Sequence, residues 1–310
     1  MNDHKSIFSG AHTALVTPFT RPGDALDIDH FDAQIRFQAS GGIRGIVVCG
    51  TTGETPTLDA VERRTVIARA VEIGRPLGLL VTAGAGSNST AKAIDLQREA
   101  EQLGADATLQ VVPYYNRPSQ EGLYRHFRAI ADVAQVPIVL YDVPGRTGTG
   151  LAVDTVCRLA DHENIVAIKS ASGMLDDVSR LVRETDLAVL SGDDSLTLSI
   201  QALGGVGVVS VISNLLPDQV RNLVDAMNRG DLVAARIAHD HLHALAMGLC
   251  SLDPNPVPVK AAMAMLGRDS GVVRPPLAPL AEPGLRSLRA LLATVGFETE
   301  TADDRVQAEA

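Results

Sequence analysis

Eight short stretches of aliphatic and β-branched residues recur along the chain, at intervals of about 30 residues. In each stretch the apolar residues are continuous rather than alternating with polar ones. Continuous apolar strands are typical of a parallel sheet that is buried on both faces. The stretches are TALVTPF from Thr13, IRGIVVCG from Ile43, LGLLVTAG from Leu77, ATLQVVPYY from Ala107, PIVLYDVP from Pro137, IVAIKSAS from Ile165, LAVLSGDD from Leu187 and GVGVVSV from Gly205.

Segments with helical character separate these strands, for example Asp29–Ser40 and Asp59–Ile73. Strand and helix in alternation, eight times over, favour an α/β (β/α)₈ TIM barrel over an open doubly wound sheet. After the eighth strand the pattern is helical from Pro217 to Val295. We therefore expect a barrel carrying the active site over residues 1–225, a C-terminal helical region over 226–297 and an acidic, disordered tail over 298–310.

The composition excludes several classes of function. A formal charge of -10, with no cluster of Lys and Arg, argues against nucleic-acid binding and favours a small-molecule partner. The N-terminus lacks the pattern of a secretory signal, and no apolar run reaches the roughly 20 residues that span a bilayer. We expect a cytoplasmic protein without membrane contact. The three cysteines, free of any CxxC pairing, indicate buried free thiols and no metal site.

Polar and aromatic residues gather where the predicted strands end, which in a barrel of this kind is where catalysis takes place. These strand ends include GTTGE (50–54), PYYNRP (113–118), YDVPGRTG (141–148), Lys169 and SGDD (191–194). The sequence thus predicts an active site at the carboxyl ends of the strands.

Lys169 is the candidate nucleophile among only four lysines. It follows Ile-Val-Ala-Ile in a buried strand, where an ammonium group is costly, and a neutral amine can attack a ketone. Lys5 lies in a polar terminus, Lys92 on an exposed helix face and Lys260 where a helix begins. The alternative is that Lys169 pairs with a nearby acid at the barrel end.

Three of the four tyrosines, Tyr114, Tyr115 and Tyr141, follow or end the fourth and fifth strands. Imine formation needs proton transfer, which a phenol can provide together with a hydroxyl such as that of Thr51 or Thr52. The alternative for each tyrosine is a core residue with a satisfied hydroxyl group.

Two further groups could bind carboxylates. The Gly and Thr residues of GTTGE supply backbone and hydroxyl donors, although a plain tight turn is the alternative. Arg146, in PGRTG, can bind a second carboxylate in bidentate fashion, with a surface ion pair as the alternative.

Two motifs resemble sites of other chemistry. GAGSNS (84–89) follows a strand as a dinucleotide loop does, but it follows the third strand and lacks the last Gly. HDHLH (239–243) has the spacing of a zinc pair but has Asp240 in place of a Glu, and we interpret it as a solvated helix face.

Read in order, GTTGE, PYYNRPSQEGLYRHF, YDVPGRTG, IKSASG and SGDD closely resemble the dihydrodipicolinate synthase branch of the class I aldolase family, which also includes N-acetylneuraminate lyase. The resemblance runs from about Thr13 to Leu266 and includes NPVPVK. It implies a lyase that condenses pyruvate with L-aspartate 4-semialdehyde in the diaminopimelate route to lysine. It also implies a homotetramer, built as a dimer of dimers, without metal or organic cofactor.

The same resemblance implies roles for individual residues. Lys169 matches the Schiff-base lysine and Tyr141 the general acid and base. Thr51 and Tyr115 match the rest of the proton relay, with Tyr115 reaching into the site of a partner subunit. The matched substrate-binding positions are Thr52, Gly192, Val209 and, for the carboxylate of the semialdehyde, Arg146.

The chain departs from the family pattern at Ser170, where an acidic residue is common, and at Val209, where Ile is frequent. Two other functions stay open: a class I aldolase acting on a 2-keto-3-deoxy sugar acid, and a catalytically silent barrel that binds a ligand. In lysine-sensitive relatives, histidines and a glutamate bind lysine at a dimer interface. Those positions read Ala60, Arg63 and Lys92 here, so we expect little inhibition by lysine.

Overall fold

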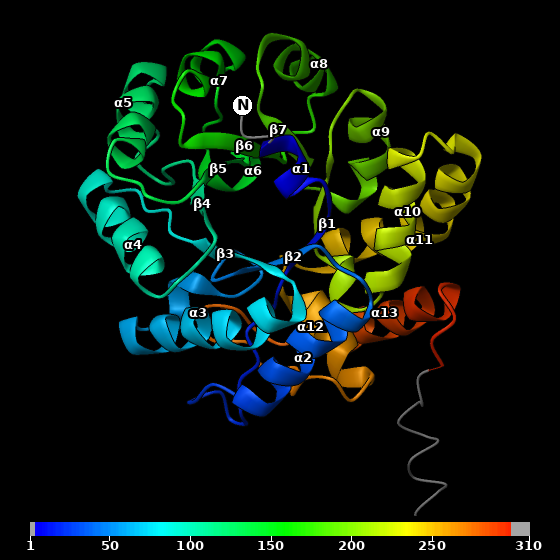
Figure 1. Cartoon of the computed structure of the whole chain (residues 1–310). Coiled ribbons are helices and arrows are strands. Elements are labelled where there is room, and N and C mark those ends of the chain that lie inside the picture. Colours follow the sequence, from blue (N-terminus) through cyan, green and yellow to red (C-terminus); the bar gives the residue numbers. More distant parts are fainter. Residues whose placement is uncertain (1–3, 299–310) are drawn as a thin grey trace, which may run out of the picture.

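Eight parallel strands close into a barrel, and β8 pairs with β1 (Figure 1). The computed structural model describes residues 4–298. The predicted TIM barrel is confirmed. The strands are β1 (Gly10–Ala14), β2 (Gly45–Val48), β3 (Leu80–Gly84), β4 (Ala107–Val111), β5 (Ile138–Asp142), β6 (Ile165–Ser170), β7 (Ala188–Ser191) and β8 (Gly207–Ser210).

A ring of helices covers the outside of the barrel (Figure 1). The ring consists of α2 (Ile28–Ser40), α3 (Ala60–Gly74), α4 (Thr90–Gln102), α5 (Gln120–Ala131), α7 (Val153–Ala160), α8 (Leu175–Glu184), α9 (Thr197–Ala202) and α10 (Pro217–Asn228). Shorter helical elements are α1 (His4–Phe8), α6 (Pro144–Thr147), η1 (Thr55–Thr57), η2 (Arg75–Leu77), η3 (Asp194–Leu196) and η4 (Ile212–Asn214). The extension is formed by α11 (Leu232–Leu252), α12 (Val257–Met265) and α13 (Glu282–Thr294).

The first helix after the GTTGE motif begins where its sequence supplies a cap. The Asp59 side chain accepts hydrogen bonds from the backbone N–H groups of Val61 and Glu62, and the Glu62 carboxylate accepts one from the N–H of Asp59. This reciprocal capping box satisfies donors that a helix leaves unpaired. It fixes the start of α3 just after the turn that carries Thr51 and Thr52.

Side chains of each strand alternate between the barrel interior and the helical ring. On β6, Ala167 belongs to the interior cluster, whereas Ile168 belongs to a cluster shared with α5 and α7. Both faces are buried, which explains why the strand sequences are continuously apolar. The alternation places Lys169 inside the barrel. At the opposite end of the barrel, Phe8 of α1 packs into the same interior cluster.

The first strand differs from its predicted position. It spans Gly10–Ala14, whereas the sequence favoured a strand from Thr13 onward. The apolar residues after Ala14 leave the barrel wall, and Leu15 and Val16 join two different clusters outside it. The continuous apolar run therefore predicted correctly that these residues are buried, but it did not predict where the strand ends.

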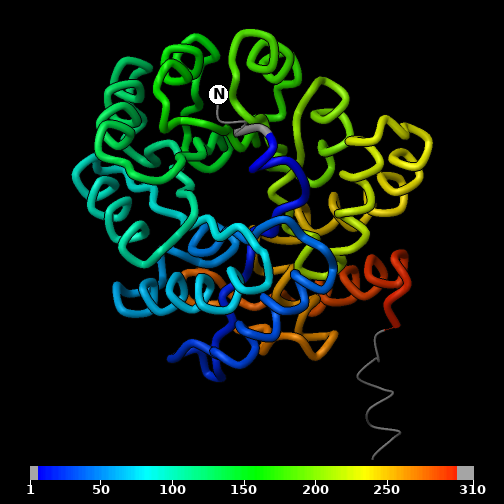
Figure 2. Tube along the Cα trace, viewed as in Figure 1, coloured from blue at the N-terminus to red at the C-terminus, as the bar shows by residue number. Residues whose placement is uncertain are grey.

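The C-terminal helices pack on one side of the barrel, near α2 (Figure 2). Leu242 and Leu245 of α11 share a hydrophobic cluster with Ala11 of β1 and Val208 of β8. The division at residues 225 and 226 stays a prediction; α10 continues to Asn228 across it. Of the predicted tail, 298–310, residues 299–310 lie outside the described part of the chain.

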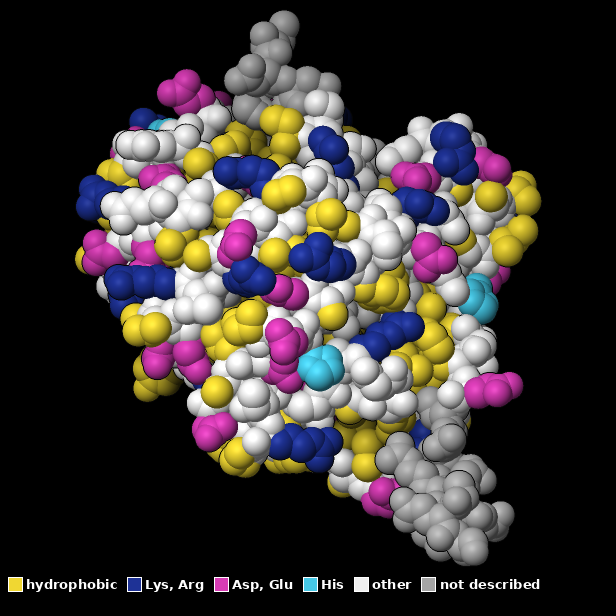
Figure 3. All heavy atoms as spheres, turned by 60° about the horizontal axis from the view of Figure 1, so that its bottom comes forward, with side chains coloured by type: hydrophobic (Ala, Val, Ile, Leu, Met, Phe, Trp, Pro, Cys, Tyr) yellow, Lys and Arg dark blue, Asp and Glu magenta, His cyan; other side chains and the backbone are white. Residues whose placement is uncertain are grey.

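Acidic and basic side chains are interspersed over the face of the molecule shown in Figure 3. Within residues 4–298, no helix combines the length and the apolar character that crossing a membrane requires. Cys49 is buried as expected, but Cys157 is half-buried and Cys250 is exposed, so the expectation of three buried thiols was wrong for those two.

Candidate active site

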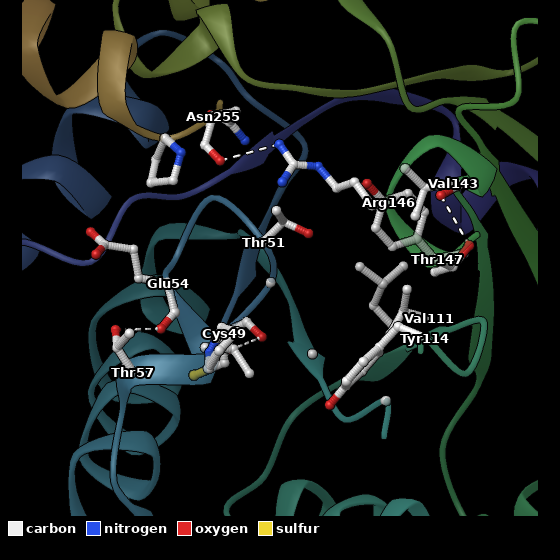
Figure 4. Close-up of a pocket in the computed structure, with 18 of the residues that line it drawn as sticks. Cys49, Thr51, Glu54, Thr57, Val111, Tyr114, Val143, Arg146, Thr147 and Asn255 are labelled. Atoms are coloured by element: carbon white, nitrogen blue, oxygen red, sulfur yellow. Dashed lines mark hydrogen bonds between the residues drawn. The ribbon is translucent and has the colours of Figure 1, made fainter. Parts of the chain in front are cut away.

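A pocket of about 370 Å³ opens at the carboxyl ends of the strands, a size that suits a small molecule. Most of its wall comes from the segment after β2 and from the ends of β3, β4 and β5. Four residues of the extension complete it: Asn255, Pro256, Pro276 and Leu277. Among the predicted site residues, Thr51, Tyr141 and Arg146 line this pocket. Figure 4 shows Thr51 and Arg146.

Lys169 lies beside Tyr141 inside the barrel. The two residues are paired in register across β5 and β6, and Lys169 Nζ lies 4.2 Å from the centroid of the Tyr141 ring. Lys169 is 5% exposed. Within residues 4–298 its amine has no hydrogen bond or ion pair, so no acid holds it, and the alternative of an acid-paired lysine has no support in the geometry. The amine meets a phenol ring at the pocket wall.

Lys260 is also buried, so burial alone does not distinguish Lys169 from the other lysines. It is the more deeply buried lysine, with 0% exposure, although the sequence suggested only the start of a helix there. Its Nζ donates to Glu54 Oε1 at 2.8 Å and to the carbonyl oxygen of Thr17 at 2.9 Å. The two lysines therefore differ in their partners and not in whether they are buried.

Gly192 lies against the Lys169 side chain. A Cβ atom at Gly192 would lie 3.0 Å from Lys169 Cγ and 2.9 Å from the Cβ of Ala171, closer than side chains tolerate. The Gly192 N–H donates to the carbonyl oxygen of Ser170 at 2.7 Å. Glycine here gives the Lys169 side chain its room.

Val209 and Ser170 are the two positions that depart from the family pattern. Val209 is buried in the interior cluster that contains Tyr141. Ser170 follows Lys169 on β6, and strand alternation turns it away from the barrel interior. The replacement of an acid at Ser170 therefore leaves the lining of the interior unchanged.

The GTTGE motif forms a tight turn between β2 and η1. The Glu54 N–H donates to the carbonyl oxygen of Thr51 at 3.1 Å, and Glu54 has a left-handed backbone with φ +51°. Thr51 is half-buried in the pocket wall. Thr52 is buried outside the pocket lining, and its hydroxyl oxygen accepts a hydrogen bond from Asn255 Nδ2 at 2.9 Å.

Arg146 extends from α6 across the pocket. Its Nη2 donates to the carbonyl oxygen of Asn255 at 3.2 Å, and the residue is exposed (Figure 4). It makes no ion pair within the described residues, so the alternative of a surface ion pair has no support there. A guanidinium with free donors at a pocket mouth can bind an incoming carboxylate.

Tyr115 lies outside the pocket of its own chain. It is 90% exposed and has a left-handed backbone with φ +73°, whereas its neighbour Tyr114 lines the pocket. The single chain therefore does not bring Tyr115 together with Thr51 and Tyr141.

Sequence reasoning missed Asn255 and Glu54, which connect the turn to the extension. The available signal was a lone Asn and a lone Lys in the apolar, proline-rich stretch NPVPVK. That stretch indicated a helix start, and its contact with the turn depends on more than 200 residues of intervening fold.

The structure accounts for the two motifs that resemble sites of other chemistry, GAGSNS (84–89) and HDHLH (239–243). A Cβ at Gly86 would lie 2.5 Å from the backbone nitrogen of Val111, so this glycine serves the packing of neighbouring strand ends. His239 and His243 contact each other, with ring centroids 5.0 Å apart. Within residues 4–298, no group of three His, Cys, Asp or Glu side chains has the arrangement of a metal site.

The fold and the position of the pocket define the class of the chain. It is a (β/α)₈ barrel enzyme whose pocket lies at the carboxyl ends of its strands. A model of the dihydrodipicolinate synthetase family matches residues 7–295. The chain belongs to this family.

Individual relatives agree with the assignment. The chain is 47% identical over 289 residues to the 4-hydroxy-tetrahydrodipicolinate synthase of Geobacter sp. (strain M21), covering 92% of this chain and 98% of that protein. A solved structure of the synthase from Cyanidioschyzon merolae with lysine bound has 39% identity and a TM-score of 0.91, covering 94% of this chain and 99% of the other. A structure described as the first monomeric variant of a dihydrodipicolinate synthase has 39% identity and a TM-score of 0.92, covering 96% and 99%.

These comparisons confirm the predicted family, the predicted lyase class and the predicted synthase activity. They favour the synthase over the sugar-acid aldolase and over a silent barrel.

Proposed function

We propose that the chain condenses pyruvate with L-aspartate 4-semialdehyde through an imine on Lys169. The observation that carries this proposal is the Lys169 amine, which has no acidic partner within residues 4–298 and lies against the Tyr141 ring at the pocket wall. Such an amine is available to attack a ketone.

The chemistry balances without an added cofactor. The Lys169 amine attacks C2 of pyruvate, and loss of water gives the imine. Loss of a proton from C3 gives an enamine, which forms a carbon–carbon bond to the aldehyde carbon of the semialdehyde. The amino group of the semialdehyde then attacks C2 and displaces Lys169, which closes the ring and frees the enzyme. Each turnover releases one water molecule.

Proton transfer in these steps is assigned to Tyr141, Thr51 and Tyr115. Tyr141 and Thr51 line one pocket, and Tyr115 is exposed on the surface of its own chain. We propose that Tyr115 completes the relay in a partner subunit, within a homotetramer built as a dimer of dimers. A phenol that is 90% exposed in one chain supports this, because the assembly would bury it.

Substrate binding is assigned to Thr52, Gly192, Val209 and Arg146. Gly192 lies against the Lys169 side chain, Val209 lies in the interior cluster with Tyr141, and Thr52 follows Thr51 in the turn. We assign these three to the binding of pyruvate. Arg146, exposed at the mouth, would receive the carboxylate of the semialdehyde. We further propose that the enzyme works in the cytoplasm.

Borohydride trapping tests the nucleophile. Incubation with pyruvate and borohydride is expected to leave a reduced adduct on Lys169, located by mass spectrometry of peptides. Lys169→Ala should leave none. An adduct on Lys260, or no adduct on the wild-type enzyme, would refute the assignment.

A panel of aldehydes tests the second substrate. With pyruvate fixed, turnover is expected to be fastest with aspartate semialdehyde. Arg146→Ala should still form the pyruvate imine but lose roughly 10- to 100-fold in kcat/KM for the semialdehyde, since a charge-assisted hydrogen bond contributes about 1.5–3 kcal/mol. Faster turnover with a sugar-derived aldehyde would favour the sugar-acid aldolase.

A further inference from the structure

We propose that Lys260 is a positioning residue, which holds the turn of residues 51–54 in place from the C-terminal extension. The inference rests on the proposed roles of Thr51 and Thr52 in that turn. It assigns the second buried lysine of the chain to the active site without giving it any contact with substrate.

The Lys260 ammonium is enclosed by three groups. It donates to Glu54 Oε1 at 2.8 Å and to the Thr17 carbonyl oxygen at 2.9 Å, and it lies 4.2 Å from the centroid of the Phe19 ring. The side chains of Lys260 and Glu54 are 0% and 1% exposed. Both hydrogen bonds and the ring contact of this amine are made within the protein, so it is not placed to reach a substrate.

These contacts attach the turn to the extension at two points. Glu54, the last residue of the turn, binds Lys260 directly. Gly53 is held indirectly, because its carbonyl oxygen accepts from Thr17 Oγ1 at 2.8 Å and the Thr17 carbonyl in turn accepts from Lys260.

A third attachment comes from the same segment of the extension. Asn255, five residues before Lys260, donates from Nδ2 to Thr52 Oγ1. Figure 4 shows Glu54, Thr51 and Asn255 around one side of the pocket. The residues that flank Thr51 and Thr52 are therefore fixed by α12 and the residues just before it.

The second carboxylate oxygen of Glu54 also has a partner. Glu54 Oε2 accepts from the backbone N–H of Arg274 at 3.0 Å, and the Arg274 guanidinium binds Glu62 of α3 with two contacts of 2.6 Å. Both carboxylate oxygens of Glu54 are thus used, and the carboxylate cannot rotate without losing a partner.

Stability alone does not account for this pair. Moving two charges out of water costs free energy, and their mutual attraction often does no more than offset this cost. A protein with an apolar or neutral pair in their place can therefore be as stable. What the ion pair adds is a fixed geometry: a short-range, directional connection between the turn and the extension. A displacement of about 1 Å at a catalytic group can cost on the order of 100-fold in rate.

The test separates geometry from stability by comparing a single variant with a neutral pair. Lys260→Met leaves the Glu54 carboxylate buried without its cation and is expected to lower Tm by several degrees. The double variant Glu54→Gln/Lys260→Gln keeps hydrogen-bonding groups but no charge, and is expected to regain most of the lost Tm. Its kcat/KM is expected to stay on the order of 10- to 100-fold below the wild-type value. Hydrogen exchange at the amides of residues 51–54 is expected to be faster in both variants.

A second pair of variants guards against loss of folding. Thr17→Val removes the hydroxyl that holds Gly53 and keeps the backbone carbonyl that Lys260 binds; Thr17→Ser keeps both. Faster exchange at residues 51–54 is expected in Thr17→Val and not in Thr17→Ser. Arg69→Met, which removes an ion pair between α2 and α3, controls for the loss of an ion pair elsewhere and should leave exchange in the turn unchanged.

Two results would overturn the inference: wild-type exchange at residues 51–54 in the double variant, or wild-type kcat/KM in that variant. A wild-type enzyme without synthase activity would instead refute the proposed function, and the exchange data would still decide whether Lys260 holds the turn.

Discussion

The two buried lysines, Lys169 on β6 and Lys260 on α12, differ in the groups that face their amines, and this difference supports the different roles proposed for them. Lys260 meets a carboxylate, a carbonyl oxygen and a ring face, which together hold a cation. Lys169 meets a phenol ring and no acid within residues 4–298. Burial raises the free energy of both ammonium groups. Each amine lies 4.2 Å from a ring centroid, but only Lys260 also has a carboxylate and a carbonyl oxygen as partners.

The room around Lys169 gives a prediction for Gly192. Gly192→Ala places a methyl group 3.0 Å from Lys169 Cγ and should displace the side chain. We expect a loss on the order of 10- to 100-fold in kcat/KM, with slower trapping of pyruvate by borohydride.

The control is Gly145→Ala, at a position where an added Cβ meets no atom within 4 Å. Because Gly145 lies on α6 beside Arg146, trapping of pyruvate rather than turnover is the measurement to compare. Equal trapping rates in Gly192→Ala and the wild-type enzyme would contradict the steric argument.

Of the site residues, the sequence predicts those whose signal is local. Lys169 and Tyr141 stand at the ends of recognisable strands, and alternation sets the direction of their side chains. The anchoring of Thr52 by Asn255 was not predictable, because 203 residues separate them and no local pattern connects a proline-rich stretch to a turn. Burial of Lys260 was equally hidden, since its acidic partner lies 206 residues away.

At the scale of elements, α3 and α4 border a groove of about 740 Å³ that also contains Arg63 and Lys92. Arg63 lies on α3 at the wall of this groove. It is buried, and its guanidinium donates to the Gly84 carbonyl oxygen at 2.6 Å and to Glu99 Oε2 at 3.1 Å. Glu99 also accepts from Arg64, so this carboxylate of the groove is already neutralised.

We therefore expect lysine to inhibit this enzyme weakly or not at all. The groove is lined by Lys92 and three arginines, Arg63, Arg64 and Arg98, against three acids, Asp59, Asp95 and Glu99. The excess of cations disfavours an incoming ammonium. Turnover measured across a lysine titration up to millimolar concentration is expected to stay nearly constant.

Lys92→Glu supplies the matched variant, since it exchanges a cation for an acid at the exposed edge of the groove. It should be more sensitive to lysine than the wild-type enzyme. Saturable inhibition of the wild type at sub-millimolar lysine would show that another acidic group binds the ammonium.

His12 of β1, which contacts Phe8 of α1, makes the free energy of unfolding depend on pH. His12 Nε2 lies 3.0 Å from the Phe8 carbonyl oxygen, which a neutral ring can bind as a donor, and burial lowers the pKa of His12 to about 4. The unfolded chain takes up this proton near pH 6.5 and the folded chain near pH 4. The contribution of His12 is therefore complete above pH 6.5 and is lost as the pH falls from 6.5 to about 4.

Thermal unfolding across this range measures the effect. For His12 alone the loss is on the order of 3 kcal/mol. His12→Gln keeps a donor for Phe8 without a titrating group, so its Tm should fall less steeply over the same range. Parallel curves for the two proteins would contradict the assignment.

The repeat of strand and helix made the barrel predictable, because each unit is specified within its own stretch of sequence. The position of the extension was not predictable in the same way. Its helices contain many apolar residues, but no local pattern indicates which side of the barrel they cover. Their contact with β1 and β8 depends on the finished barrel.

The proposed exchange of Tyr115 between subunits can be tested by complementation. Lys169→Ala and Tyr115→Phe should each have little activity alone. Co-expressed chains should recover up to about a quarter of the wild-type activity, since random pairing gives half mixed dimers with one complete site each. Absence of recovery in mixed dimers that are shown to form would place Tyr115 in the site of its own chain.

Part of the pocket wall comes late in the chain, from Asn255, Pro256, Pro276 and Leu277. This affects when a chain growing on the ribosome can become active. A ribosome delivers the chain from the N-terminus at about 5–20 residues per second. All eight strands have been made well before Asn255 emerges from the exit tunnel. A nascent chain at that stage holds Lys169 and Tyr141 but has no acceptor for Arg146, no donor for Thr52 and no cation for Glu54. Condensation is therefore expected to begin only after Leu277 has emerged, and a product truncated before Asn255 should be inactive.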